Sequence, residues 1–559
     1  MTSAGLAPGR LVAGWMRGYQ RAMLRGDLLG ALTVWTLIVP ESVAYAEIAG
    51  VPPQNAFYGA PVALVVYALL GGSRFLVVGA TSAAAVLSAS TVTEVSSDPR
   101  VAIGLSTALA VMVGAVLVVA GVARLGFVTN FLAEPVLVGF LFGMALTIMV
   151  RQAGKILGVP SGDGDFFQRL AKLLSQVGDW SWTTIAVGVA ALTGLFVLER
   201  FVPRLPASLI VLAAGLIVSQ ALDLKAHGVQ TVGKVPSAVP IPHLPGIPEA
   251  DWAKLAGGAL GVALVAFAES YSISERFARI HGDELNADRE MIAVGSANFA
   301  VGFFRSFAVS GSASRSAAAE GAGGRSPMVS LAAAVLVLLT GAFLTSLFTP
   351  LPEAVLGAIV IMAVRGFLRV AELRRYAADD RPSFWVALTA LLGVLVVDLL
   401  PGLLLAVVLS LLLFIAYAST PRVAPLGRLP GTDVWGDLQE HRDAVPHPGI
   451  LVLRPDGQLF FGNVGRVRSD VKRLASDTEA APRAVVVDLT ATYYLGVPVL
   501  DTLADLSADL DHQGFELHLA RVRARPTRSL SQHPLHATLS PGRIHPTVTE
   551  AVRALSGEA

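Results

Sequence analysis

Two glutamates, Glu41 and Glu269, lie inside long apolar runs and occupy matching places in two similar stretches of the chain. Residues 31–47 (ALTVWTLIVPESVAYAE) and 259–275 (ALGVALVAFAESYSISE) agree at six of seventeen positions. An acidic side chain at the centre of a bilayer costs about 2.5–3.5 kcal/mol on insertion scales, so its presence indicates a function. Because burial disfavours the charged form of a carboxyl group, each glutamate can carry a coupling proton. The alternatives are a bound cation or, for Glu269, a static ion pair with Arg315.

A second chemical feature is a pair of segments in which a short apolar start is followed by Gly, Ser, Thr and Ala. These are residues 76–88 (LVVGATSAAAVLS) and 307–319 (FAVSGSASRSAAA). The pattern predicts an extended strand that turns into a helix in mid-membrane, where the free N–H groups of the helix start attract anions. The polar groups available to such an anion are those of Thr81, Ser82, Ser312, Ser314 and Arg315. The alternative is that small residues only permit close helix packing. Tyr45, one helical turn after Glu41, either lines the site or packs.

Membrane-spanning elements must position these residues. The chain of 559 residues is 54% hydrophobic and only 15% charged, whereas soluble domains carry about 25% charge. Apolar runs of spanning length alternate with polar breaks from residue 27 to 420. We predict about fourteen membrane segments, at 27–48, 56–71, 79–95, 101–123, 131–153, 182–201, 205–222, 253–275, 287–303, 310–321, 327–348, 352–368, 383–399 and 401–420.

The internal similarity divides these segments into two sets of seven. An odd number of spans per repeat forces the repeats into opposite orientations, which defines an inverted-topology repeat. The N-terminal segment, residues 1–26, is rich in arginine and lacks the apolar core of a cleavable signal peptide. Its arginines are Arg10, Arg17, Arg21 and Arg25. They predict a cytoplasmic N-terminus, and the even number of spans then places the tail, residues 422–559, in the cytoplasm.

Several function classes are disfavoured. The chain has no cysteine, which excludes disulfides and thiolate metal sites. We find no Walker loop, nucleophile elbow or metal-ligand cluster, so we expect no enzyme, no catalytic residue, no metal and no cofactor. The net charge is +1 and no basic, aromatic-rich groove is evident, so no nucleic-acid partner is expected.

Two longer runs carry a resemblance to a known family. The run LIVPESVAYAEIAGVPPQNAFYGAPVALVVYALLGGSRFLVVGATSA resembles the N-terminal signature of the sulfate-permease family of anion transporters, which includes prestin and pendrin. SFAVSGSASRSAAAEGAGGRSPM, followed by LPEAVLGAIVIMAVRGF, is similar to its second signature. The resemblance covers nearly the whole chain. It implies a homodimer with an anion site between segments 3 and 10. It also implies that a core domain (segments 1–4 and 8–11) slides against a gate domain (segments 5–7 and 12–14).

The resemblance also implies roles for single residues. Carried over by position, the site-lining residues are Glu41 and Tyr45 in segment 1, Thr81 in segment 3, and Ser314 and Arg315 in segment 10. Many relatives have glutamine where Glu41 stands. A carboxylate at this position repels an anion unless it is protonated. The presence of glutamate instead of glutamine at position 41 therefore favours coupling to protons, with Na⁺ as a less favoured coupling ion.

The tail has the pattern of a small α/β domain. We expect strands at 449–455, 483–489 and 515–522 and helices at 463–476 and 498–512. It resembles the STAS domain, which sulfate transporters share with anti-sigma-factor antagonists. The bacterial antagonists carry a phosphorylatable Ser or Thr in a turn after the central strand. Here residues 496–499 (GVPV) offer no hydroxyl, so we expect a folding and dimer-tuning module without a phosphoswitch.

Together these features predict a proton-coupled secondary transporter of small anions in a bacterial-type cytoplasmic (inner) membrane. The candidate substrates that the resemblance implies are sulfate, bicarbonate, halides and C4-dicarboxylates such as fumarate. Two alternatives stay open. One is an anion channel or uncoupled anion exchanger on the same fold. The other is a membrane-tethered regulator in which the tail signals and the spans only anchor.

Overall fold

The computed structural model describes most of the chain. The described residues are 14–96, 98–127, 134–162, 164–202, 207–234, 236–237, 239–397, 399–477, 482–539 and 542–557. Arg10 and the first residues of the predicted segments at 131–153 and 205–222 lie outside them. The chain forms two compact units, Met1–Ser410 and Leu411–Ala559.

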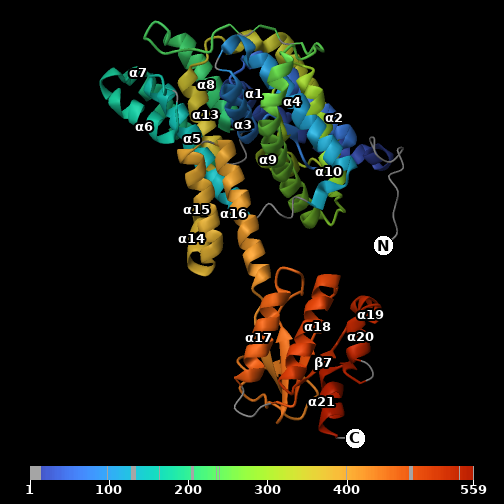
Figure 1. Ribbon diagram of the computed structural model, residues 1–559. Coiled ribbons are helices and arrows are strands. Elements are labelled where there is room, and N and C mark those ends of the chain that lie inside the picture. Colours follow the sequence, from blue (N-terminus) through green and yellow to red (C-terminus); the bar gives the residue numbers. More distant parts are fainter. Residues whose placement is uncertain are drawn as a thin grey trace. The chain divides into compact units, whose positions relative to one another are not determined.

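Each predicted membrane segment contains a helix, as expected where the bilayer forces backbone groups to bond within their own segment (Figure 1). The helices are α1 (Leu24–Ile48), α2 (Pro53–Leu70), α3 (Ser82–Val95), α4 (Pro99–Val122), α5 (Glu134–Leu157), α6 (Phe166–Ser175), α7 (Trp182–Phe201), α8 (Ala207–Ala221), α9 (Glu249–His281), α10 (Ala287–Gly302), α11 (Ala313–Gly321), α12 (Met328–Leu339), α13 (Glu353–Arg365), α14 (Val370–Asp379), α15 (Arg381–Val396) and α16 (Leu399–Ser419). The short helices α6 and α14 were not predicted. Among the described residues, seven helices are long and apolar enough to cross a membrane. The total of fourteen spans remains a prediction.

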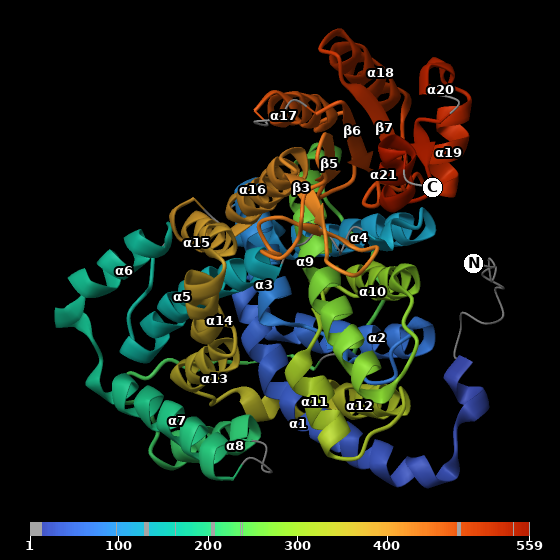
Figure 2. The same ribbon diagram turned by 90° about the horizontal axis from the view of Figure 1, so that it is seen from below.

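The helices of the first unit pack in two groups, seen side by side in Figure 2. The core group contains α1–α4 and α9–α12, and the gate group contains α5–α8 and α13–α15. Each group therefore combines helices from both halves of the sequence, in agreement with the core and gate division that the resemblance implies. Helices α4 and α10 pack closely in the core group, where a side chain at Gly114 would collide with the backbone of Phe299. The first turn of α16 joins the gate group, since Gly402 packs on Gly393 of α15.

Two short strands pair inside the core group. β1 (Val78–Gly79) and β2 (Ser310–Gly311) are antiparallel, with Val78 opposite Gly311 and Gly79 opposite Ser310. Each strand leads directly into a shortened helix, α3 or α11, so the predicted strand-to-helix segments are confirmed.

Polar side chains hold the outer edges of this strand pair. Val77 N donates to Ser316 Oγ (2.9 Å), Gly311 N to Ser270 Oγ (2.8 Å) and Val309 N to Asn298 Oδ1 (2.9 Å). An unpaired N–H at this depth would cost several kcal/mol. These hydrogen bonds explain why Ser270, Asn298 and Ser316 are fully buried among apolar residues.

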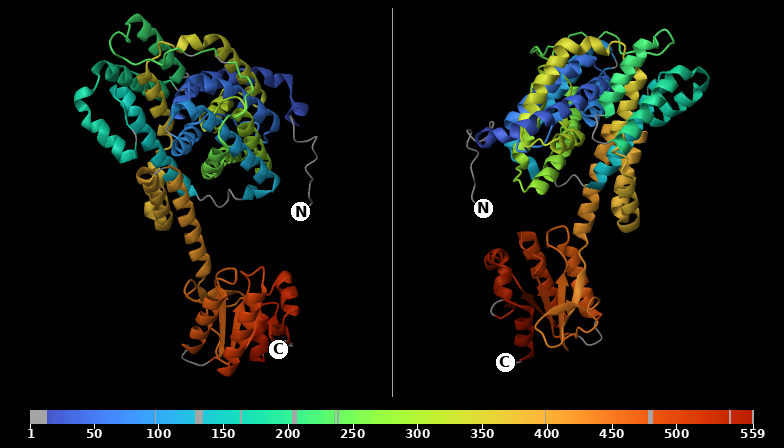
Figure 3. Two further views of the ribbon diagram at one scale, coloured as in Figure 1. Left: turned by 45° about the horizontal axis from the view of Figure 1, so that its top comes forward. Right: turned by 180° about the vertical axis from the view of Figure 1, so that it is seen from behind.

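The second unit contains a six-stranded sheet that carries helices (Figures 1 and 3). Its strands are β3 (Val423–Arg428), β4 (Trp435–Asp437), β5 (Ile450–Pro455), β6 (Ala484–Asp488), β7 (Glu516–Ala520) and β8 (Ile544–His545), in the order β4-β3-β5-β6-β7-β8. Strands β5 to β8 are parallel, and β3 is antiparallel to both its neighbours. The helices are α17 (Val464–Ser476), α18 (Val497–His512), α19 (Ala524–Ser531), α20 (Pro534–Leu539) and α21 (Val548–Ser556). The three predicted strands and two predicted helices are confirmed, whereas the β3–β4 hairpin and β8 were not predicted.

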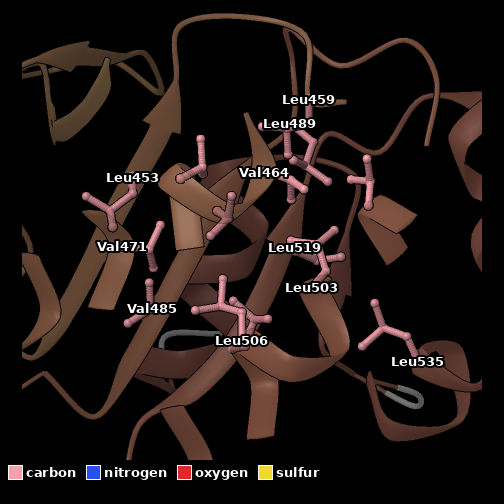
Figure 4. Packing of buried hydrophobic residues seen from close by; sticks show 14 of the residues in the cluster. Leu453, Leu459, Val464, Val471, Val485, Leu489, Leu503, Leu506, Leu519 and Leu535 are labelled. Carbon is pink, nitrogen blue, oxygen red and sulfur yellow. The ribbon is translucent and has the colours of Figure 1, made fainter. Parts of the chain in front are cut away.

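Two apolar clusters hold this sheet. The larger cluster joins β5, β6 and β7 to α17 and α18 through residues such as Val485, Val471 and Leu503 (Figure 4). The smaller cluster lies on the other face, where Val486 packs with Trp435 and Ala551 of α21. Both faces of β6 are therefore covered, which explains the continuous apolar run AVVV in this strand.

Candidate anion site

A cavity of about 740 Å³ lies where α1, α3 and α11 of the core group face α7, α8 and α13 of the gate group. Seven of the eight predicted site residues line it: Glu41, Tyr45, Thr81, Ser82, Glu269, Ser312 and Ser314. The gate side contributes aliphatic side chains, among them Leu195, Ile359 and Met362, together with the charged side chains of Glu199, Arg365 and Arg369. The polar wall of the cavity therefore belongs mostly to the core group. The helix α1 runs unbroken through Pro40, which places Glu41 and Tyr45 on the same cavity.

The starts of the two shortened helices meet at this cavity. Thr81 caps α3, and its Oγ1 accepts from Ala84 N at 3.3 Å. Ser312 caps α11, and its Oγ accepts from Arg315 N at 3.4 Å. A helix start carries roughly half a positive charge. Two such starts with their hydroxyl groups form an environment that favours an anion.

Glu269 is bound by a residue that sequence reasoning missed. Ser310 Oγ donates to Glu269 Oε2 at 2.7 Å, and Thr81 Oγ1 lies 2.6 Å from Ser310 Oγ. Ser310 is in β2, one residue before the Gly-Ser run on which the sequence argument concentrated. The chain of three side chains links α9, β2 and the start of α3, and thereby joins the two repeats at the cavity.

Arg315 lies behind the cavity wall rather than on it. Its side chain is fully buried, and Nη2 donates to Ala80 O at 2.6 Å. Nε lies 3.6 Å from Glu41 Oε2, so Arg315 pairs with Glu41. The structure does not contain the static Glu269–Arg315 ion pair that was the alternative. Glu269 instead accepts a hydrogen bond from Ser310. Gly79 leaves room for the guanidinium, since a Cβ there would lie 3.0 Å from Nη1.

The guanidinium of Arg315 is incompletely satisfied. Within the described part of the chain, Nε and Nη1 have no hydrogen-bond partner. Burying a cation with free donors is expensive unless a partner supplies compensation. The compensation available in the structure is the carboxylate of Glu41, which itself faces the cavity.

A third buried carboxylate, Glu290 of α10, also escaped the sequence analysis. Its Oε1 accepts from Gly72 N (2.5 Å) and Ser73 N (3.0 Å). Its Oε2 accepts from Tyr67 Oη (2.6 Å) and Ser274 Oγ (3.4 Å). Four donors leave this carboxylate saturated, and it anchors the loop before β1 to α10. No sequence signal separates it from an ordinary charge near a helix start.

The comparisons with known proteins agree with this architecture. The model of the sulfate permease family matches residues 24–390, and that of the STAS domain matches residues 441–551. A Mycobacterium tuberculosis protein named "Probable sulfate transporter" is 34% identical over 555 residues, covering 99% of each chain. The "Low affinity sulfate transporter 3" of Stylosanthes hamata is 30% identical over 97% of this chain and 89% of its own length.

Two solved structures share the fold. The murine Solute Carrier 26 family member A9 anion transporter, in an inward-facing state, has a TM-score of 0.90 with 21% identity. It covers 99% of this chain and 96% of its own. The transmembrane domain of the cyanobacterial bicarbonate transporter BicA has a TM-score of 0.61 with 19% identity, over 70% of this chain and 98% of that domain.

Proposed function

Because this chain belongs to the sulfate permease family of anion transporters, we propose that it is a proton-coupled secondary transporter of small anions. The substrate class is sulfate, bicarbonate or a C4-dicarboxylate such as fumarate. The names of the relatives support sulfate within this range, and the name of the structural neighbour BicA includes bicarbonate. We propose further that the protein is a homodimer in a bacterial inner membrane, with the STAS domain, residues 422–559, in the cytoplasm.

The observation that carries the proposal is the convergence of the α3 and α11 starts on one cavity. Each start brings about half a positive charge and a hydroxyl group, and Arg315 adds a full charge behind the wall. A small anion with three or four oxygens can accept from several of these donors at once. The cavity offers the lining hydroxyls of Thr81, Ser82, Ser312 and Ser314 for this purpose.

Proton coupling follows from the position of Glu41 between Arg315 and the cavity. While Glu41 is charged, it neutralises Arg315 and repels an anion. Once Glu41 is protonated, the charge of Arg315, which has unpartnered donors, acts on the cavity. Anion binding and proton binding therefore favour each other, and the coupling is reciprocal by linkage. Glu269 is the second proton acceptor in the same cavity, held by Ser310.

The division of the cavity wall favours movement of the core group as a body. Its hydroxyls and carboxylates lie mostly on α1, α3, α9 and α11, whereas the facing gate helices present Leu195, Ile359 and Met362 together with the ion pair of Glu199 and Arg365. Because that pair lies within the gate group, it does not have to be broken when the core group slides. We propose that the site travels with the core group in an elevator-type cycle.

A flux experiment in proteoliposomes tests the function. Purified full-length protein is assayed for uptake of labelled sulfate, bicarbonate and fumarate, with and without an inward proton gradient. Accumulation driven by the gradient, with saturation and counterflow, is the expected result. Saturable exchange that does not depend on the proton gradient would favour the uncoupled exchanger. Non-saturating flux without counterflow would favour the channel. Absence of flux for all three anions would favour a regulator anchored by its spans.

A further inference from the structure

A second cavity, of about 750 Å³, lies at the other end of α1. The first cavity is lined along α1 from Leu32 to Tyr45, and the second by Glu47 and Ile48 at the end of α1 and by Gly50 just after it. The second cavity also lies between the core and gate groups, but against the C-terminal halves of α3 and α5, the start of α13 and the short helix α6. The described lining residues of the two cavities do not overlap. The two cavities therefore lie in succession along one interface.

The second cavity is basic. Its charged lining residues are Arg151, Lys155, Arg169 and Lys172, against Glu47 and Glu353. Lys155 of α5 forms an ion pair with Glu47 of α1, which connects the gate group to the core group. The α6 side chain of Lys172 lies over Gly162, where a Cβ would come within 2.8 Å of Nζ. The excess of positive charge is contributed by the gate side, on α5 and α6.

A buried polar group points to an occupant. Gln152 lines this cavity and is 2% exposed, yet its Oε1 has no hydrogen-bond partner among the described residues. An unsatisfied buried amide oxygen costs about 1–3 kcal/mol. An amide oxygen accepts hydrogen bonds, so a water molecule in the cavity would satisfy Gln152. The four lining cations exceed the two lining carboxylates by two charges, which favours an oxyanion beside that water.

We propose that this cavity is an outer vestibule that binds small oxyanions before they reach the site between α3 and α11. The proposal rests on the proposed function and on the topology that places the C-terminal end of α1 outside. Concentrated positive charge in a cleft raises the local anion concentration and the association rate. Lys155, paired with Glu47, connects the α5 wall of the vestibule to α1. Lys172 and Arg169 form its anion-attracting wall.

A charge-selective labelling experiment tests the vestibule without relying on transport. The chain has no cysteine, so Ser161→Cys, in the lining of the cavity, provides a single reporter. A membrane-impermeant anionic methanethiosulfonate and its cationic counterpart are added from outside to right-side-out vesicles. Ser237→Cys, exposed in the loop before α9, is the matched control outside the cavity. At position 161 we expect the ratio of anionic to cationic rates to exceed that at 237 by about fivefold, falling with added salt.

Two further variants identify the source of the charge. Lys172→Gln, alone and with Arg169→Gln, should bring the ratio at position 161 to the control value, whereas Lys225→Gln, outside the cavity, should leave it unchanged. Added sulfate should slow labelling at 161 and not at 237. The proposal would be overturned if the ratio of anionic to cationic labelling rates were equal at both positions, or if Lys172→Gln left the ratio at position 161 unchanged. The labelling rates can be measured whether or not any anion is transported. Failure of the vestibule proposal can therefore be distinguished from failure of the transport proposal.

Discussion

Glu41 and Arg315 form an ion pair in which only one partner faces the cavity. Glu41 Oε2 lies 3.6 Å from Arg315 Nε, and Glu41 lines the cavity while Arg315 is fully buried behind it. The carboxylate therefore stands between the guanidinium and any anion in the cavity. Its protonation changes the net charge of the pair from zero to plus one, which is the physical basis of the coupling proposed above.

The first prediction concerns the two cavity glutamates. Glu41→Gln and Glu269→Gln should each abolish acid-driven accumulation of the transported anion, because the amide cannot take up a proton. Anion exchange without a gradient should persist, since glutamine is nearly the same size and leaves the cavity open. Glu199→Gln, on the gate side of the same cavity, serves as the control. Full gradient-driven accumulation in both test variants would disprove this assignment.

The second prediction compares two arginines. Arg315→Ala should weaken anion binding by about tenfold or more, equivalent to about 1.4 kcal/mol, because it removes the charge behind Glu41. Arg279→Ala should have little effect, since Arg279 lies outside the lining of the cavity and its pair with Glu275 at 3.2 Å is exposed, and such pairs contribute about 0–1 kcal/mol. Titration calorimetry with sulfate measures both. Arg315→Lys, which keeps the charge, should bind better than Arg315→Ala. Equal affinities in all four proteins would remove Arg315 from the site.

The third prediction concerns Glu290, which sequence reasoning missed. Glu290→Ala leaves the donors of Tyr67, Gly72 and Ser73 buried without an acceptor, at about 1–3 kcal/mol each. We expect a strongly lowered thermal stability in detergent, measured by fluorescence-detected size exclusion after heating. Glu269→Gln, at a carboxylate with one hydrogen-bond donor in the structure, should be much less destabilised. Similar melting points for the two variants would contradict the anchoring role.

The fourth prediction concerns a histidine pair in the tail. His518 Nδ1 lies 3.0 Å from His545 Nε2 in the interior of β7 and β8. Burial lowers the pKa of His518, and burial together with the neighbouring His518 lowers the pKa of His545, both from 6.5. A lowered folded-state pKa means that the unfolded chain binds more protons, so stability is lost as the pH falls below about 6.5.

Thermal melts of the tail fragment, residues 420–559, provide the measurement. Its melting temperature should fall between about pH 7 and pH 5, and His518→Phe should reduce that fall. His512→Gln, at an exposed position of α18, is the control and should melt like the parent at each pH. An unchanged pH dependence in His518→Phe would show that the pair is not responsible.

The fifth prediction uses the link between Glu47 of α1 and Lys155 of α5. Glu47→Cys and Lys155→Cys, introduced together into this cysteine-free chain, should be joined by a short bifunctional reagent. The cross-link should stop transport and leave the first cavity accessible from one side only, because it ties the core group to the gate group. Each single-cysteine protein, treated identically, should keep its flux. Undiminished transport after complete cross-linking would rule out sliding of the core group.

Much of the architecture follows from the sequence alone. The lengths of the apolar runs, the matching stretches around Glu41 and Glu269, and the Gly-Ser-Ala runs predicted the helices, the inverted repeat and the two strand-to-helix segments. These features depend on local composition and on the requirement that backbone groups in a bilayer be satisfied within their own segment. The same reasoning named seven residues that line the first cavity, because their polarity is exceptional in apolar surroundings.

Only the tertiary structure decided which polar groups meet. Arg315 pairs with Glu41 rather than Glu269, Ser310 connects Thr81 to Glu269, and Glu290 reaches a hydroxyl 223 positions away. Local composition carries no information on these pairings, because they depend on how helices from the two repeats approach each other. The second cavity was likewise invisible in the sequence. Its basic residues lie on α5 and α6, and they face one cavity only when those helices pack near the end of α1.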